Sequence, residues 1–257
     1  MRSTLATLIL GMSLVAGCEV GDAGGGGGGG GDDTGGGGTD AAIEQTPKLT
    51  ATVDKTTIST ELGTTSQITV SLTSSGGFSG AVALTAEVVD GAGAAVPGWT
   101  VGFNNANVNL AANGSGSAVA TLTIPTQNQG LAGTVKIHAT STLGVQDFTT
   151  TVTALNQVTM TVTENGGQCV YPTESALMVK IGTKVRFLNK FSTAKITIHS
   201  NGGNEGVAHE PDPGHDANTS YDKTFTAAGT FDWYCHQPGP DLNKNGINKN
   251  PKFTVVP

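Results

Sequence analysis

The chain has 257 residues, with 13 Lys or Arg against 20 Asp or Glu, and its formal net charge at pH 7 is −7. Charges this sparse, with no cluster of Lys or Arg, give no electrostatic case for binding nucleic acid. We therefore expect a partner that is a protein, a small ligand or a metal ion.

Residues 1–17 have the pattern of an export signal. Arg2 precedes an apolar run, Leu5 to Val15, that is too short to span a bilayer as a mature helix. The motif Val15-Ala16-Gly17-Cys18 resembles the bacterial lipobox; the alternative is an ordinary signal peptide with a chance cysteine. The resemblance implies that Cys18 is acylated and anchors the protein to a membrane. Glu19 is not the aspartate of an inner-membrane retention signal, so we expect the outer membrane, facing the periplasm or the cell surface.

Cys18 and the glycine-rich segment up to residue 46 are predicted to form a tether. Gly24–Gly31 and Gly35–Gly38 are separated only by Asp and Thr, so this segment has almost nothing to bury. We expect a flexible coil that spaces the folded part of the protein from the membrane.

Residues 47–155 are predicted to form an immunoglobulin-like β-sandwich. Gly, Asn and Pro clusters separate short segments that alternate apolar with small or hydroxylated residues, as in Gln67–Leu72, Ala81–Thr85, Ala118–Ile124 and Thr134–His138. The segment resembles bacterial Ig-like surface domains, notably at Ser74–Gly80. It has no cysteine and one histidine, His138, which we interpret as structural or solvent-facing. We expect a spacer or interaction module here.

Residues 156–257 are predicted to form a second all-β domain. Strands are expected at Val158–Thr163, Leu177–Ile181, Lys184–Asn189, Lys195–Ser200, Ser220–Thr226, Thr230–His236 and Lys252–Val256. Aromatic residues concentrate in this domain and give it enough bulk for a core of its own.

Two motifs in this domain resemble the cupredoxins, the family of small β-sandwiches that includes plastocyanin-like blue-copper proteins. Gly182–Asn189 is similar to the strand that precedes the first copper histidine, and Ala228–Cys235 is similar to the hairpin that delivers the copper thiolate. The resemblance covers roughly residues 173–256. It implies a Greek-key sandwich that binds copper, for electron transfer with a redox protein partner or for copper handling in the cell envelope.

The ligand positions depart from the family pattern. Ile196 stands where the first copper histidine is expected, and Pro238 stands where a second histidine follows the cysteine. The axial methionine is also missing, because the last methionine of the chain is Met178. Most of the usual blue-copper ligands are therefore absent from their usual places.

The period of two along a strand sorts the remaining candidates onto two faces. Cys235 shares its face with Trp233 and should point into the sandwich, whereas His236 should point outward. In the earlier strand, Ile196 should point inward and His199 outward. A bulge at either strand end would break this count.

The outward histidines suggest a different copper site. In multicopper oxidases, relatives of the same sandwich, histidines at similar outward positions bind a second metal centre. By that resemblance His199 and His236 form an outward site, to which His209 and His215 add ligands. Four of the five histidines lie between residues 199 and 236, and thiolate and imidazole suit copper or zinc better than calcium or magnesium.

We therefore predict copper bound by a subset of His199, His209, Cys235 and His236, with His215 as a further candidate. A mononuclear site that includes Cys235 implies electron transfer. A site made by the outward histidines implies copper capture or delivery.

A disulfide between Cys169 and Cys235 is the main alternative. Once Cys18 is acylated these are the only other cysteines, and the cell envelope is oxidising. The bond would close a loop of about 65 residues, contribute roughly 4 kcal/mol to stability and remove the thiolate that blue copper needs.

In a third possibility the thiols stay free and no metal binds. A metal-free protein of this kind would be a surface or structural lipoprotein that presents loops, such as residues 209–216, to a partner.

Two further motifs are weaker. Asp241–Asn248 matches the start of a calcium-binding loop, but the twelfth position is Lys252 and not Glu, so we prefer a turn before the final strand. No serine or threonine is patterned with a partner His and Asp, and no phosphate-binding glycine loop follows a strand. We expect a binding protein and not an enzyme.

Overall fold

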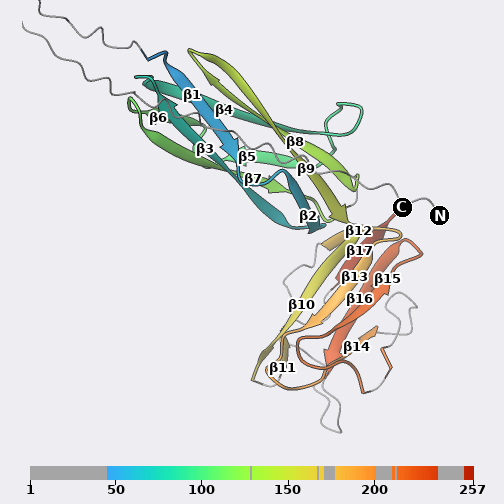
Figure 1. Cartoon of the computed structure of the whole chain (residues 1–257). Helices are drawn as coiled ribbons and strands as arrows, with labels where there is room; N and C mark the ends of the chain where they lie inside the picture. The colour runs from blue at the N-terminus through green and yellow to red at the C-terminus, as the bar shows by residue number, and fades with distance from the viewer. Residues whose placement is uncertain are drawn as a thin grey trace, which may run out of the picture. The chain divides into compact units, whose positions relative to one another are not determined.

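The computed structural model describes residues 45–127, 129–166, 168–170, 177–200, 210–211, 213–236 and 252–257. In this part of the chain every regular element is a β-strand, β1 to β17 in chain order (Figure 1). The strands form four sheets, two from β1–β9 and two from β10–β17. The predicted all-β class is confirmed. The export signal, Cys18 and all but the last two residues of the glycine-rich tether lie outside the described residues. Within the described residues, no helix is long and apolar enough to cross a membrane.

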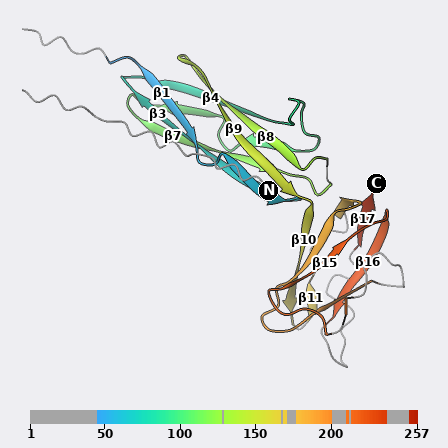
Figure 2. The same ribbon diagram turned by 45° about the vertical axis from the view of Figure 1, so that its right-hand side comes forward.

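The first sandwich is built from nine strands in two sheets. One sheet has the order β1-β3-β7-β5 and the other β2-β9-β8-β4-β6 (Figures 1 and 2). The strands are β1 (Lys48–Val53), β2 (Thr57–Glu61), β3 (Thr65–Ser75), β4 (Gly80–Val89), β5 (Thr100–Phe103), β6 (Asn107–Leu110), β7 (Ser115–Thr123), β8 (Ala132–Ser141) and β9 (Gly144–Leu155).

Alternation along these strands explains the core of the first sandwich. Ile68, Val70 and Leu72 of β3 are fully buried, and the Thr and Ser residues between them face outward. β3 pairs antiparallel with β7 from Thr65↔Thr123 to Thr73↔Ser115, so the apolar residues of both strands share the inner face. This alternation accounts for the buried face that β3 and β7 share.

The second sandwich is built from eight strands in two sheets of four. Their orders are β11-β10-β13-β15 and β12-β17-β16-β14. The strands are β10 (Gln157–Asn165), β11 (Gln168–Val170), β12 (Leu177–Lys180), β13 (Lys184–Asn189), β14 (Thr197–Ser200), β15 (Ser220–Thr224), β16 (Gly229–His236) and β17 (Lys252–Val256).

Aromatic side chains fill the core of this second sandwich. Phe187 of β13 and Trp233 of β16 are fully buried and meet edge to face, with ring centroids 4.9 Å apart. Phe225 stacks on Phe231 at 5.4 Å. Such pairs stabilise a core beyond the area that they bury. They also fix β16, the strand that carries both Cys235 and His236, against the opposite sheet.

Candidate functional site

β14 and β16 bring two of the predicted histidines together. The strands pair antiparallel, with Thr197 opposite His236 and His199 opposite Tyr234. Residues on one face of such a pair have neighbouring side chains. His199 and His236 are diagonal neighbours on that face, and their Nε2 atoms lie 2.5 Å apart. Their ring centroids are 4.3 Å apart.

This histidine pair is buried. His199 is 8% exposed and His236 7% exposed. The ring of Tyr234 stacks on that of His199, with centroids 5.3 Å apart and planes 19° apart. Thr197 Oγ1, on the same face, is buried without a hydrogen-bond partner in the described residues. The face therefore combines two imidazole nitrogens, one aromatic ring and a hydroxyl with no partner there.

The two faces deduced from strand parity hold. Trp233, Cys235, Ile196 and Ile198 are fully buried in the core, and His199 and His236 lie on the opposite face. The predicted outward direction of that face does not mean that it is open to solvent. The structure buries both imidazoles, because facing away from the sandwich core does not by itself expose a side chain.

The sulfur of Cys235 is bonded to that of Cys169. The two Cα atoms are 6.2 Å apart, and the bond joins β16 to the short strand β11. Both residues are buried. A sulfur in a disulfide is not a thiolate, so Cys235 does not offer copper the ligand that the cupredoxin resemblance implied. The donor set of a blue-copper centre therefore does not fit the residues present in this oxidised form.

The other family positions also lack metal ligands. Ile196 is fully buried among apolar residues, and Met178 of β12 is 41% exposed on a different strand. Pro238, His209 and the predicted turn Asp241–Asn248 lie outside the described residues. Within the described residues, no group of three or more His, Cys, Asp or Glu side chains gathers in a way that could hold a metal.

His215 belongs to a separate pair with Glu210. His215 Nδ1 lies 2.7 Å from Glu210 Oε1, and both side chains are more than nine-tenths buried. Glu210 Oε2 accepts the N–H of Ile198 at 2.8 Å. Burial and, secondarily, the negative charge of Glu210 raise the pKa of Tyr221. His215 is thus engaged by Glu210, and its expected role as a further copper ligand stays a prediction. The sequence analysis did not identify Glu210. The only signal for it was its position, as an acidic residue in the loop that contains His209 and His215.

The lone histidine of the first sandwich has a local partner. His138 of β8 lies 2.7 Å from Asp147 of β9, on the partly exposed face of the sheet. The structure thus agrees with a structural or solvent-facing role.

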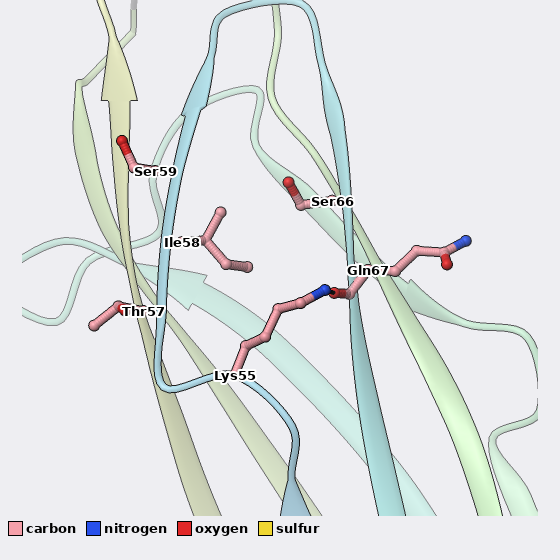
Figure 3. Close-up of a pocket in the computed structure, with 6 residues that line it drawn as sticks. All are labelled: Lys55, Thr57, Ile58, Ser59, Ser66 and Gln67. Carbon is pink, nitrogen blue, oxygen red and sulfur yellow. Dashed lines mark hydrogen bonds between the residues drawn. The ribbon is translucent and has the colours of Figure 1, made fainter.

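A hollow of about 310 Å³ lies between β2 and β3 of the first sandwich (Figure 3). Lys55 extends across it, and its ammonium donates to the carbonyl of Gln67 at 2.5 Å. The other lining residues are Thr57, Ile58, Ser59 and Ser66. Lys55 is the one charged side chain among these lining residues, and it is already hydrogen-bonded. The lining of this hollow therefore does not form a set of converging ligands.

Comparisons with known proteins show the fold alone. No protein-family model matches the chain, and no curated protein does. Among solved structures, domains 4 and 5 of the S-layer protein SbsC are 18% identical over 42% of this chain, with a TM-score of 0.31. The chain spans about half of that structure, 53%.

Two other solved structures cover more of the chain. The E. coli chaperone DraB is 9% identical over 81% of this chain and 96% of its own, with a TM-score of 0.29. A tandem of titin Ig domains is 11% identical over 82% of this chain and 98% of its own, with a TM-score of 0.27. Identities this low carry nothing about function. The architecture is that of Ig-like, all-β sandwiches.

Proposed function

We propose that this protein is a lipid-anchored, cupredoxin-like protein of the cell envelope that captures copper through His199 and His236. The observation that carries the proposal is the buried approach of the two Nε2 atoms to 2.5 Å. Neutral imidazole is a common ligand of copper and zinc, and two such nitrogens converging from neighbouring strands supply two ligands to one ion.

The ligand distances require a small opening of the pair. A bond from an imidazole nitrogen to such a metal is about 2.0–2.1 Å long. An ion shared by both rings therefore needs the Nε2 atoms to separate from their present distance by roughly 0.4 Å if the two bonds meet at a right angle, and by more if the angle is wider. We expect rotation of the two side chains about their χ angles to provide this movement.

Copper handling is favoured over electron transfer. A rigid thiolate–imidazole centre is the ligation that suits copper redox cycling, and Cys235 is committed to its bond with Cys169. A site with imidazole ligands can bind and release copper without the thiolate. His209, next to Glu210 in sequence, stays a sequence-based candidate for a third ligand.

The test is copper retention by the soluble part of the chain. The protein from residue 19 onward is dialysed against Cu(II), and bound copper is quantified for the wild type, for His199→Ala with His236→Ala, and for His138→Ala as the matched control. We expect about one copper per chain in the wild type and the control, and its loss in the double variant. Retention by the double variant would overturn the assignment of these two residues.

A metal-free structural role is the second candidate, and the Cys169–Cys235 bond favours it. In that role the sandwiches present loops to a protein partner at the cell surface, and the disulfide stabilises the scaffold. The same experiment decides between the two: no copper retained by the wild type, together with an intact mass two hydrogens below that of the reduced chain, assigns the scaffold.

A further inference from the structure

We infer that Glu210 is a positioning residue for the copper site, acting through the edge of β14 that β16 does not pair with; this inference rests on the proposed copper function. Among the described strands, β14 is the last of its sheet, and β16 pairs with only one of its edges. An unpaired strand edge is a poor platform for a precise site, because its backbone groups have no fixed partners. Glu210 and His215 supply those partners.

The segment around residues 210–215 completes the hydrogen bonding of β14. His215 exchanges two backbone hydrogen bonds with Ile196, at 3.1 and 3.0 Å. Glu210 donates its backbone N–H to the carbonyl of Ile198 at 3.0 Å. The N–H of Ile198 is then accepted by the carboxylate of Glu210 and not by a backbone carbonyl. At Ile198, the residue before His199, the side chain of Glu210 therefore accepts the backbone hydrogen bond that a neighbouring strand would otherwise accept.

The partner of Glu210 makes this arrangement specific for a carboxylate. When Glu210 is ionised it accepts a hydrogen bond from His215 Nδ1–H, which leaves the lone pair of this imidazole on Nε2. That Nε2 atom is buried and has no partner in the described residues. An amide at position 210 would donate to Nδ1 and move the proton to Nε2, where no acceptor is described. A glutamine there would thus retain the bond from Ile198 but weaken the bond to His215.

The consequence for the site follows from chain order. His199 comes directly after Ile198, and its ring must meet that of His236 across the β14–β16 pair. A shift of β14 at Ile198 moves His199 by a comparable amount. Residues that orient metal ligands without touching the metal commonly change metal affinity by about 10- to 100-fold when they are mutated.

The experiment measures Cu(II) affinity by competition with a chromophoric chelator in the protein from residue 19 onward. The variants are Glu210→Ala, Glu210→Gln and, as a destabilised control, Val162→Ala, which removes fully buried methyl groups from β10 in the other sheet. All are compared at a temperature at which circular dichroism shows each of them folded. A second readout, without copper, is the ¹⁵N spectrum of the ring nitrogens of His199 and His236.

We expect Glu210→Ala to weaken the affinity at least about 10-fold and to shift the ring nitrogen signals. Glu210→Gln should lose less, because its amide oxygen still accepts from Ile198. Val162→Ala should keep the affinity within about twofold despite its lower stability. A folded Glu210→Ala with unchanged affinity and unchanged signals would overturn the positioning role while leaving the copper function intact. Absence of copper binding by the wild type would instead remove the copper function itself.

Discussion

Gly214 leaves no room for a side chain beside β14. Its φ is +73°, and a Cβ atom there would lie 2.1 Å from the carbonyl oxygen of Ile196 and 2.6 Å from Thr197 Oγ1. Gly214→Ala should therefore lower the free energy of unfolding by about 2 kcal/mol or more, since backbone strain adds to a clash that backbone atoms cannot avoid. Urea denaturation of the soluble chain measures this loss.

Gly182 offers a matched control for the prediction at Gly214. It has a similar φ of +84°, but a Cβ atom there would meet nothing within 4 Å. Gly182→Ala should cost only the conformational part, about 1–2 kcal/mol. Equal losses at the two positions would mean that the close approach of Gly214 to Ile196 is not maintained in solution.

Asp222 gives the surface of the second sandwich a pH-dependent contribution to stability. Its carboxylate accepts from Arg186 Nε at 3.0 Å and from Arg186 Nη2 at 3.1 Å, with Lys184 Nζ 3.5 Å away. The hydrogen bond from Arg186 lowers the pKa of Asp222. The contribution is therefore complete above the ordinary aspartate pKa of about 4 and is lost as the pH falls through the lowered value.

Asp222→Asn should reveal that contribution. Because the pair is partly exposed, we expect a loss of at most about 1 kcal/mol at pH 7, measured by urea denaturation. The stability of the variant and of the wild type should converge once the pH is below the lowered pKa of Asp222, because the carboxyl is then protonated in both the folded and the unfolded state. A difference that persists unchanged at that pH would show that the ion pair is not its cause.

At the scale of the strands, a disulfide cross-links β11 and β16 of the second sandwich. It joins residues 66 apart in the sequence. On the chain-entropy account, a loop of this length stabilises the fold by about 4 kcal/mol. Cys169→Ser with Cys235→Ser should therefore lower the unfolding free energy of the second sandwich by about that amount, as followed by the fluorescence of the buried Trp233.

The wild type under strong reductant serves as the comparison for the cysteine variant. It should lose about the same stability, because both treatments remove the same cross-link. The pair formed by His199 and His236 lies on the other face of β16 from Cys235, so copper retention should survive in the cysteine variant at temperatures where it is folded. Loss of copper from that folded variant would show that the sulfur contributes to the site.

The sequence predicts the positions of the strands better than it predicts the burial of their side chains. Alternation located each of the seven strands expected in the second sandwich, and strand parity separated Cys235 from His236. It missed β11, which has three residues and too little periodicity to detect. It also could not foresee the burial of His199, because burial depends on segments from elsewhere in the chain. The role of Glu210 was not predicted for the same reason: its partner Ile198 is 12 residues away in the sequence and contacts it only in the folded protein.

Pairing of the two cysteines was left open by the sequence for a chemical reason. A buried cysteine at the end of an alternating strand is compatible with a copper thiolate and with a disulfide. Only the approach of β11 to β16 decides between them. The resemblance of Ala228–Cys235 to a copper-binding hairpin therefore predicted only that this segment forms a strand. Whether Cys235 is a copper ligand depends on which residues lie next to it in the fold.

At the scale of the whole molecule, the remaining prediction concerns attachment. If Cys18 is acylated, the protein should sediment with membranes of a bacterial host that processes lipoproteins, and it should incorporate labelled fatty acid. Two or more acyl chains are needed for stable anchoring, and a lipobox cysteine is expected to carry them. Cys18→Ser should move the protein to the soluble fraction without changing its unfolding curve, because residues 45–257 contain all of the described strands.

Cys169→Ser is the control for a general effect of losing a cysteine: it should still sediment and still take up label. If Cys18→Ser also sediments and labels, the attachment has another origin and the role of residues 18–46 as a tether fails with it.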